Sequence, residues 1–189
     1  MTNEEFIKLY WRQYLSLEKD MIDTDDYVTI DSKNYGTFSN EYAKLFVMAC
    51  TEIDSLSVEF SKMVKEEYHE ESAIKANNIL KRIDTIKTAY DKLGNYHVKT
   101  KFPYNELHYV PYRNFSDKCA EDWWQDYNEV KHNRTELSSG GKYNYEKANL
   151  KNTMNALSAL FLMCFLIGCY LNDGKFELVS EAKLFEFAG

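Results

Sequence analysis

The chain has 189 residues, enough for a single domain with a sizeable buried core. Its two prolines and seven glycines disfavour β-sandwiches, barrels and disordered linkers and favour long helices. A net charge of −7 argues against a broad nucleic-acid-binding surface but leaves room for a small basic patch.

Apolar residues at helical spacing predict five helices. These cover about Asn3–Lys19, Ser39–Glu67, Ser72–Leu93, Asp117–Arg134 and Tyr145–Asn172. Ser39 is the expected N-cap of the second helix, and Gly94 is the expected C-cap of the third. The sequence therefore predicts an all-α fold, an up-and-down bundle of about five helices.

The segments between these helices differ in character. Residues 20–35 look irregular, although residues 27–30 have the composition of a short extended piece. Residues 96–115 hold both prolines and alternate apolar with polar residues, which predicts an extended crossover, with room for a short hairpin, before the fourth helix. We expect one domain over residues 1–189, with a core bundle at about 38–172. The tail, residues 173–189, is apolar enough to dock on the bundle or on a partner.

The run Met154–Leu171 is almost entirely apolar and close to the length of a membrane span. The strongly polar turns before it, Glu146–Asn152, favour instead a central helix covered on every side by its neighbours. The acidic N-terminus, residues 1–5, is followed by no apolar stretch typical of a signal peptide. We therefore expect a cytoplasmic protein with no membrane contact.

The four cysteines are scattered without metal-site or disulfide-framework spacing. They are Cys50, Cys119, Cys164 and Cys169. We expect reduced core thiols, no bound metal and no cofactor.

Chemistry is suggested mainly by residues 123–134, which combine two tryptophans, a histidine and two cations. Asn128 and His132 are four residues apart and lie one above the other on a helix, with Lys131 about 60° away. Histidine titrates near neutral pH, so this face could bind an anion or move a proton. The candidate catalytic residues are His132, Asn128, Lys131 and Arg134, and the candidate ligand-binding residues are Trp124, Tyr127, Lys151 and Asn152.

A structural interpretation competes with this one. In it, Trp123, Tyr127 and Val130 are core residues, the cations are solvated, and His132 is a satisfied interior histidine. The last predicted helix supplies three asparagines at three-residue spacing, which either line a polar seam facing Asn128 and His132 or are partly exposed. These are Asn149, Asn152 and Asn155, with Asn155 the one expected to be buried.

Two acids interrupt the apolar second helix. Glu52 or Asp54 could orient His132 or neutralise Lys131, or both could be solvated. His132 and Arg134 diverge by about 160° on a continuous helix, so they cannot grip one phosphate together. Either the helix ends near Asn133 and Arg134 turns back, or a second subunit completes the site, which a homodimer would do.

A late helix carrying Asn128-x-x-x-His132 before a final apolar helix resembles the HEPN superfamily. The family motif is an arginine, often followed by asparagine, and a histidine, with four to six residues between the arginine and the histidine. On this chain the family arginine falls on Tyr127, so Lys131 or Arg134 would have to replace it. The resemblance covers about residues 39–172.

The resemblance implies an all-α, commonly dimeric protein of a family that includes metal-independent ribonucleases of toxin–antitoxin and phage-defence systems. A ribose 2′-OH would attack the adjacent phosphate, with His132 as general base or acid and Asn128 holding the phosphate or the ring. Expected partners are RNA or a nucleotide, a second copy of the chain, and a cognate antitoxin or other protein. The alternative, also found in the family, is a non-catalytic helical module that binds a nucleotide or a partner protein.

Overall fold

The structure is a computed structural model that describes residues 1–68, 78–104, 106–116, 118–138 and 140–189. It is a helical bundle with one small sheet, which confirms the predicted all-α class. The helices are α1 (Asn3–Phe6), α2 (Arg12–Asp23), α3 (Asn40–Tyr68), α4 (Ile79–Ala89), α5 (Asp122–His132) and α6 (Leu150–Leu171). A π-helical segment, Ile7–Trp11, joins α1 to α2, so the two form one continuous rod.

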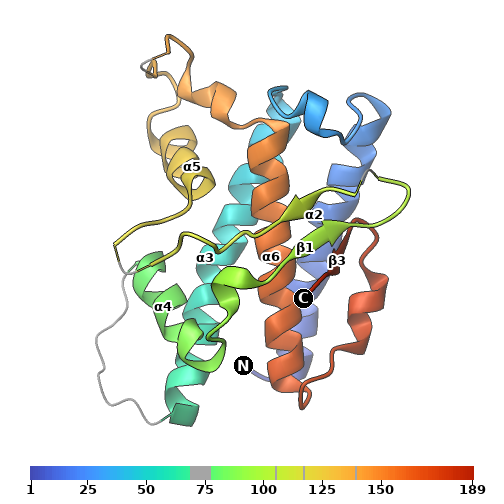
Figure 1. Cartoon of the computed structure of the whole chain (residues 1–189), viewed down its shortest axis with the longest axis vertical. Helices are drawn as coiled ribbons and strands as arrows, with labels where there is room; N and C mark the ends of the chain where they lie inside the picture. Colours follow the sequence, from blue (N-terminus) through green and yellow to red (C-terminus); the bar gives the residue numbers. More distant parts are fainter. Residues whose placement is uncertain (69–77, 105, 117, 139) are drawn as a thin grey trace.

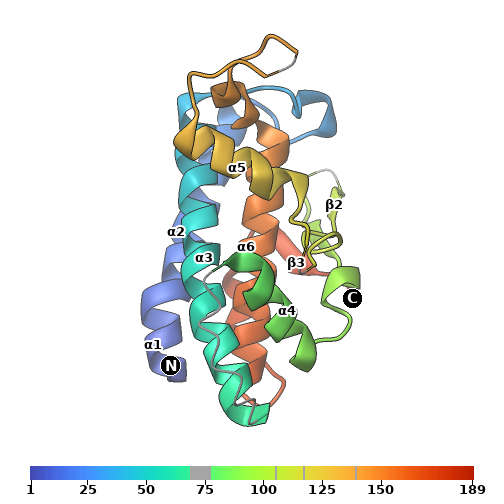
Figure 2. The ribbon, with the colours of Figure 1, turned by 90° about the vertical axis from the view of Figure 1, so that its left-hand side faces the viewer.

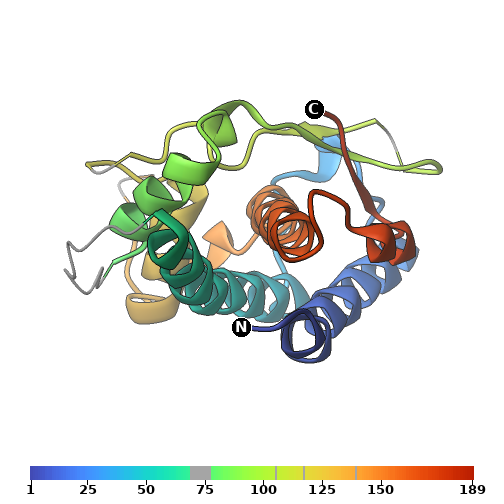
Figure 3. The ribbon, with the colours of Figure 1, turned by 90° about the horizontal axis from the view of Figure 1, so that it is seen from below.

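Helix α6 is the centre of the bundle. It packs against α3, α2 and α5, while the small sheet covers its opposite side (Figure 1, Figure 3). It is long and apolar enough to span a membrane, but 78% of its most apolar stretch is buried inside the molecule. That burial is compatible with the core helix of a soluble protein.

Capping side chains fix where the long helices begin. The Ser39 hydroxyl accepts the Tyr42 N–H at 3.0 Å, which confirms the predicted N-cap of α3. The Asn149 side chain accepts the Asn152 N–H at 3.0 Å and starts α6. Because Asn149 is a cap with extended backbone, the predicted start of this helix at Tyr145 is wrong, and a 3₁₀ turn, η5 (Asn144–Lys147), precedes α6.

The sheet has the order β2-β1-β3 and is antiparallel throughout. Its strands are β1 (Val98–Thr100), β2 (His108–Tyr109) and β3 (Phe185–Phe187). β1 and β2 pair as the short hairpin that the sequence allowed within residues 96–115. β3 belongs to the C-terminal tail, which docks on its own bundle with Leu184 and Phe185 fully buried.

Three local predictions are corrected. α4 ends at Ala89, because Tyr90 leaves helical geometry, and Gly94 lies in a 3₁₀ turn instead of capping the helix. Residues 27–30 form no strand, because the Asp25 carboxylate accepts the Ile30 N–H at 2.6 Å and folds them into a loop. α5 begins only at Asp122. The predicted start of the third helix, residues 72–77, and residue 117 lie outside the described residues.

Candidate functional site

Helix α5 lies across α3 and α6 (Figure 2). Its inner face buries Trp123, Trp124, Tyr127 and Val130. The Tyr127 ring meets Phe46 of α3 edge-on, with centroids 6.2 Å apart. Trp123, Tyr127 and Val130 are therefore core residues, as the structural interpretation predicts. Tyr127, which stands where the family motif carries arginine, is one of them.

The outer face of α5 presents Asn128, Lys131 and His132 to solvent. The Asn128 amide donates to the Trp124 carbonyl one turn earlier, at 3.1 Å. His132 makes no hydrogen bond or ion pair with any described residue. It is exposed, so it is not a satisfied interior histidine.

Lys131 bends back over the helix that carries it. Its Nζ lies 5.3 Å from the centroid of the Tyr127 ring. The contact with Tyr127 is the main reason that the pKa of Lys131 is raised, and the negative charge of Asp54 on α3 adds to it. Lys131 is therefore fully charged at neutral pH.

The helix ends at His132, as one of the two expected geometries for Arg134 requires, but the contacts of Arg134 are with Val130 and Tyr145 and not with His132. The Arg134 Nε donates to the Val130 carbonyl at 3.3 Å, and the guanidinium lies 6.0 Å from the Tyr145 ring. Arg134 thus turns back onto the last turn of α5, where a cation also favours the negative end of the helix dipole. The residue remains exposed.

A pocket of about 370 Å³ opens beside Asn128, between α3, α4 and α5. Its walls are formed by Asp54, Asn78, Ile79, Leu80, Arg82, Ala120, Trp124, Gln125 and Asn128. Arg82 is buried, donates to the Ser57 hydroxyl at 2.8 Å and pairs with Asp54. Asp54 therefore forms its ion pair with Arg82, and it affects Lys131 only through the field of its charge. Asp54 does not hydrogen-bond His132, so it does not orient the imidazole.

No pattern in the sequence points to this arginine, because Arg82 and Asp54 belong to separate helices whose contact depends on the packing of α4 on α3. Glu52, the other acid considered, is half-buried, and burial raises its pKa.

A polar seam does join α5 to α6, but through other partners than expected. The Asn152 amide donates to the Asp126 carboxylate at 2.8 Å and to the Lys147 carbonyl at 2.9 Å. The Lys147 ammonium pairs with Asp126 at 3.0 Å and also with Glu129. Buried Asn152 therefore has a structural role, and the positive charge of Lys147 is neutralised.

Lys151 and Asn155, also predicted from the sequence, lie in the first two turns of α6. Asn155, expected to be the buried asparagine, is only half-buried because it faces outward and donates to the Lys151 carbonyl at 2.9 Å. Lys151 itself is exposed, so its ammonium remains accessible to a ligand.

Among the described residues, no group of histidine, cysteine and acidic side chains could hold a metal ion. Burial raises the pKa of the Cys50 and Cys164 thiols, which makes them poor nucleophiles. Comparisons with protein-family models, curated proteins and solved structures find no match to this chain.

Proposed function

We propose that the protein is an HEPN-like, RNA-directed protein that contacts RNA through the outer face of α5. The observation that carries this proposal is the exposure of Asn128, Lys131 and His132 together on one helical face. The imidazole has no partner among the described residues, so it is available to a ligand.

Local charge supports an anionic ligand. Lys131, Arg134, Lys142 and Lys151 are exposed near the ends of α5 and α6. The acids of α5 that could repel a phosphate are partly compensated, since Asp126 and Glu129 both pair with Lys147. An otherwise acidic protein therefore has a small region in which phosphate contacts are favourable.

Cleavage would follow from the same face. His132 would take the proton of a ribose 2′-OH or return one to the leaving oxygen, while Lys131 or Arg134 stabilised charge on the phosphate. Because Tyr127 is a core residue and Arg134 is bound to the Val130 carbonyl, the arginine of the family motif has no direct counterpart beside His132. We propose that a second copy of the chain completes the site in a homodimer.

The same observation favours a second candidate, a non-catalytic module. With no arginine of the motif beside it, the α5 face would bind a nucleotide or a partner protein through Asn128 and the adjoining 370 Å³ pocket. In that case RNA or the partner is bound and released unchanged.

The experiment is incubation of labelled tRNA and single-stranded RNA with the purified protein in EDTA. The variant is His132→Ala, and His108→Ala is the matched control, because His108 is also an exposed histidine but lies on β2. Cleavage that the first variant loses and the second keeps supports the ribonuclease. Binding without cleavage, weakened by changes on α5, supports the module. If the protein neither binds nor cleaves these RNAs, the RNA-directed function is overturned.

A further inference from the structure

The segment that follows α5 runs antiparallel to the segment that leads into η5, at the end of the bundle where α3 and α6 begin (Figure 1, Figure 2). Leu137 and Tyr143 pair in an antiparallel bridge between the two segments. The Tyr145 N–H donates to the Arg134 carbonyl at 3.1 Å, which fastens the two segments together close to His132. This part of the chain therefore begins directly at the outer face of α5.

Large apolar side chains are exposed at this end of the molecule. Leu137 is 61% exposed, Tyr143 54% and Phe38 44%. Because Leu137 and Tyr143 lie directly opposite each other in the bridge, their side chains share one side of it. The Phe38 ring meets the Tyr145 ring edge-on, with centroids 6.0 Å apart. These four side chains form what we call the end surface, and a gathering of exposed apolar groups indicates a surface that a partner covers.

The cations of this region are not neutralised. Arg134, Lys142 and Lys151 are exposed and form no ion pair with any residue that the structure describes. The same stretch holds two acids, Glu136 and Glu146, and the Glu146 carboxylate already accepts a backbone N–H at 3.1 Å. The partner of the end surface is therefore expected to be anionic, although the chain as a whole has a net charge of −7.

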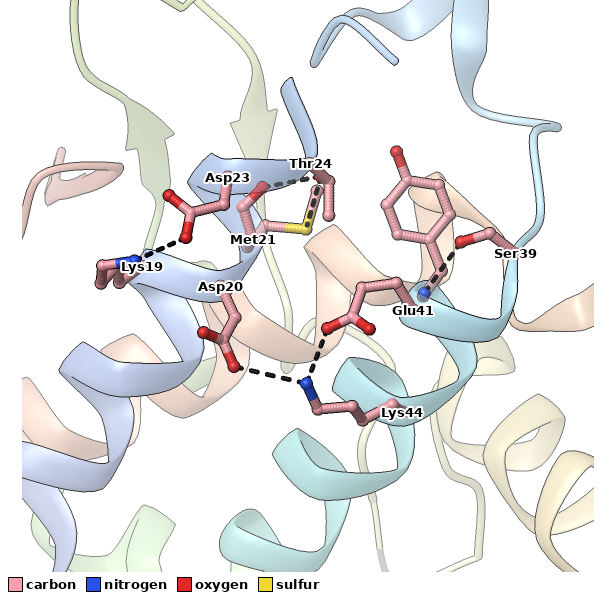
Figure 4. Close-up of polar contacts among 9 residues, drawn as sticks. Lys19, Asp20, Met21, Asp23, Thr24, Ser39, Glu41 and Lys44 are labelled. Atoms are coloured by element: carbon pink, nitrogen blue, oxygen red, sulfur yellow. Dashed lines mark hydrogen bonds and ion pairs between the residues drawn. The ribbon is translucent and has the colours of Figure 1, made fainter. Parts of the chain in front are cut away.

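The corner where α2 ends and α3 begins, next to Phe38 in the chain, is different. Its lysines are paired with carboxylates: Lys19 lies 2.5 Å from Asp23, and Lys44 lies 2.8 Å from Glu41 and 3.6 Å from Asp20 (Figure 4). Unpaired cations beside exposed rings thus distinguish the end surface from this corner.

Cations beside exposed rings are the combination that binds single-stranded nucleic acid. The cations contact phosphates, and each ring stacks on an unpaired base, which strengthens binding about fivefold or more per base. A double helix keeps its bases stacked on one another, so such rings favour single strands. An acidic protein segment would also pair with the cations. RNA is favoured over it because the end surface continues from the α5 face that is proposed to contact RNA.

We infer that the end surface binds unpaired bases of single-stranded RNA. Tyr143 and Phe38 are the stacking rings, and Arg134 and Lys142 contact the phosphates between the bases. The inference rests on the proposed RNA-directed function of α5 and adds a path to it, since RNA that passes His132 continues over the end surface.

The test is fluorescence anisotropy of a labelled single-stranded RNA, with the full chain in a His132→Ala background that prevents the proposed cleavage. Tyr143→Ala should weaken binding about fivefold or more, and Tyr143→Phe should bind as tightly as the background, because it keeps the ring. Tyr27→Ala is the matched control, because Tyr27 is also an exposed tyrosine but lies among the carboxylates of the α2–α3 corner. None of these variants should change the Tm appreciably, since both tyrosines are exposed.

Two further probes define what the ring recognises. A strand of the same length without bases should bind equally well to the background and to Tyr143→Ala. The inference is overturned if Tyr143→Ala leaves the affinity for the ordinary strand unchanged, or if the variant weakens binding of the abasic strand just as much. A peptide of alternating glutamate and leucine represents a protein partner. If it binds more tightly than RNA and depends on Tyr143, the end surface is a protein-binding site instead.

Failure of this inference differs from failure of the proposed function. If Tyr143→Ala has no effect while Lys131→Ala still weakens RNA binding, the α5 face contacts RNA without the end surface. If the protein binds no RNA at all, both proposals are wrong.

Discussion

The Glu18 carboxylate of α2 accepts the backbone N–H of Leu184 at 2.9 Å, in a site where Glu18 is only 2% exposed. The same carboxylate accepts the Lys183 N–H at 2.8 Å and the Tyr14 hydroxyl at 2.6 Å. Three donors therefore satisfy one buried acid, which fastens the C-terminal segment to α2 just before β3.

Replacing Glu18 by alanine should lower the free energy of unfolding by about 2–4 kcal/mol, because two backbone N–H groups and a phenol lose their acceptor. Glu18→Gln should cost less, since its one oxygen still accepts from Tyr14 and Leu184. Urea denaturation measures both. Hydrogen exchange should also accelerate at Leu184 and in β3. Unchanged exchange there would mean that the tail is held by Phe185 and its neighbours alone.

Close packing of the tail gives a second prediction. A Cβ atom on Gly168 of α6 would lie 2.3 Å from the Phe176 ring. Gly168→Ala should therefore destabilise the protein by about 1–3 kcal/mol, although alanine is the better helix former. Thermal and urea unfolding measure the loss.

Two further variants define the cause. Gly36→Ala is the control, because a Cβ there meets nothing within 4 Å. Combining Gly168→Ala with Phe176→Leu should reduce the cost of the alanine, because leucine vacates part of the ring's space. Additive losses in the double variant would exclude the ring as the source.

A third prediction concerns pH. Burial raises the pKa of Glu121, which is 8% exposed, while hydrogen bonds from Asn114 oppose the shift. The folded protein then holds this proton more tightly than the unfolded chain, in which the pKa is about 4.3. The contribution of Glu121 to stability therefore falls as the pH rises from the unfolded to the folded pKa.

Glu121→Gln should accordingly gain stability relative to wild type as the pH rises from about 4 to 7. Glu106→Gln should do the opposite at lower pH, because the hydrogen bond from Lys99 lowers the pKa of Glu106. The contribution of Glu106 is fully present above the unfolded pKa of about 4.3 and is lost as the pH falls below it, so this variant should lose stability relative to wild type as the pH rises toward about 4.3. Urea unfolding from about pH 3 to 7 covers both windows. If the stability difference from wild type changed with pH in the same direction for both variants, the opposite pKa shifts assigned to Glu121 and Glu106 would be contradicted.

The sequence predicted those features of the fold that depend on residues within a single helix. The apolar run of α6 is visible because every side of that helix is buried, and the Ser39 cap is a local contact. Pairing of β3 with β1 was not predictable, since strands of three residues are too short to show a periodic pattern.

The candidate site divides in the same way. Spacing placed Asn128 and His132 on one face, and the structure has both exposed there. The pairs Asp54–Arg82 and Asp126–Lys147 each join separate elements, so they depend on how the helices pack and leave no local signal. Whether the exposed face acts on RNA stays a prediction.

A salt titration would test that face directly. In a His132→Ala background, which prevents the proposed cleavage, Lys131→Ala should weaken binding of single-stranded RNA and make the slope of log affinity against log salt less steep by about 0.7, the contribution of one phosphate contact. Lys175→Ala is the control, because Lys175 is an exposed lysine beyond α6. Fluorescence anisotropy measures both slopes. If the two lysine variants have equal slopes, Lys131 does not contact phosphate, and RNA binding through the outer face of α5 is wrong.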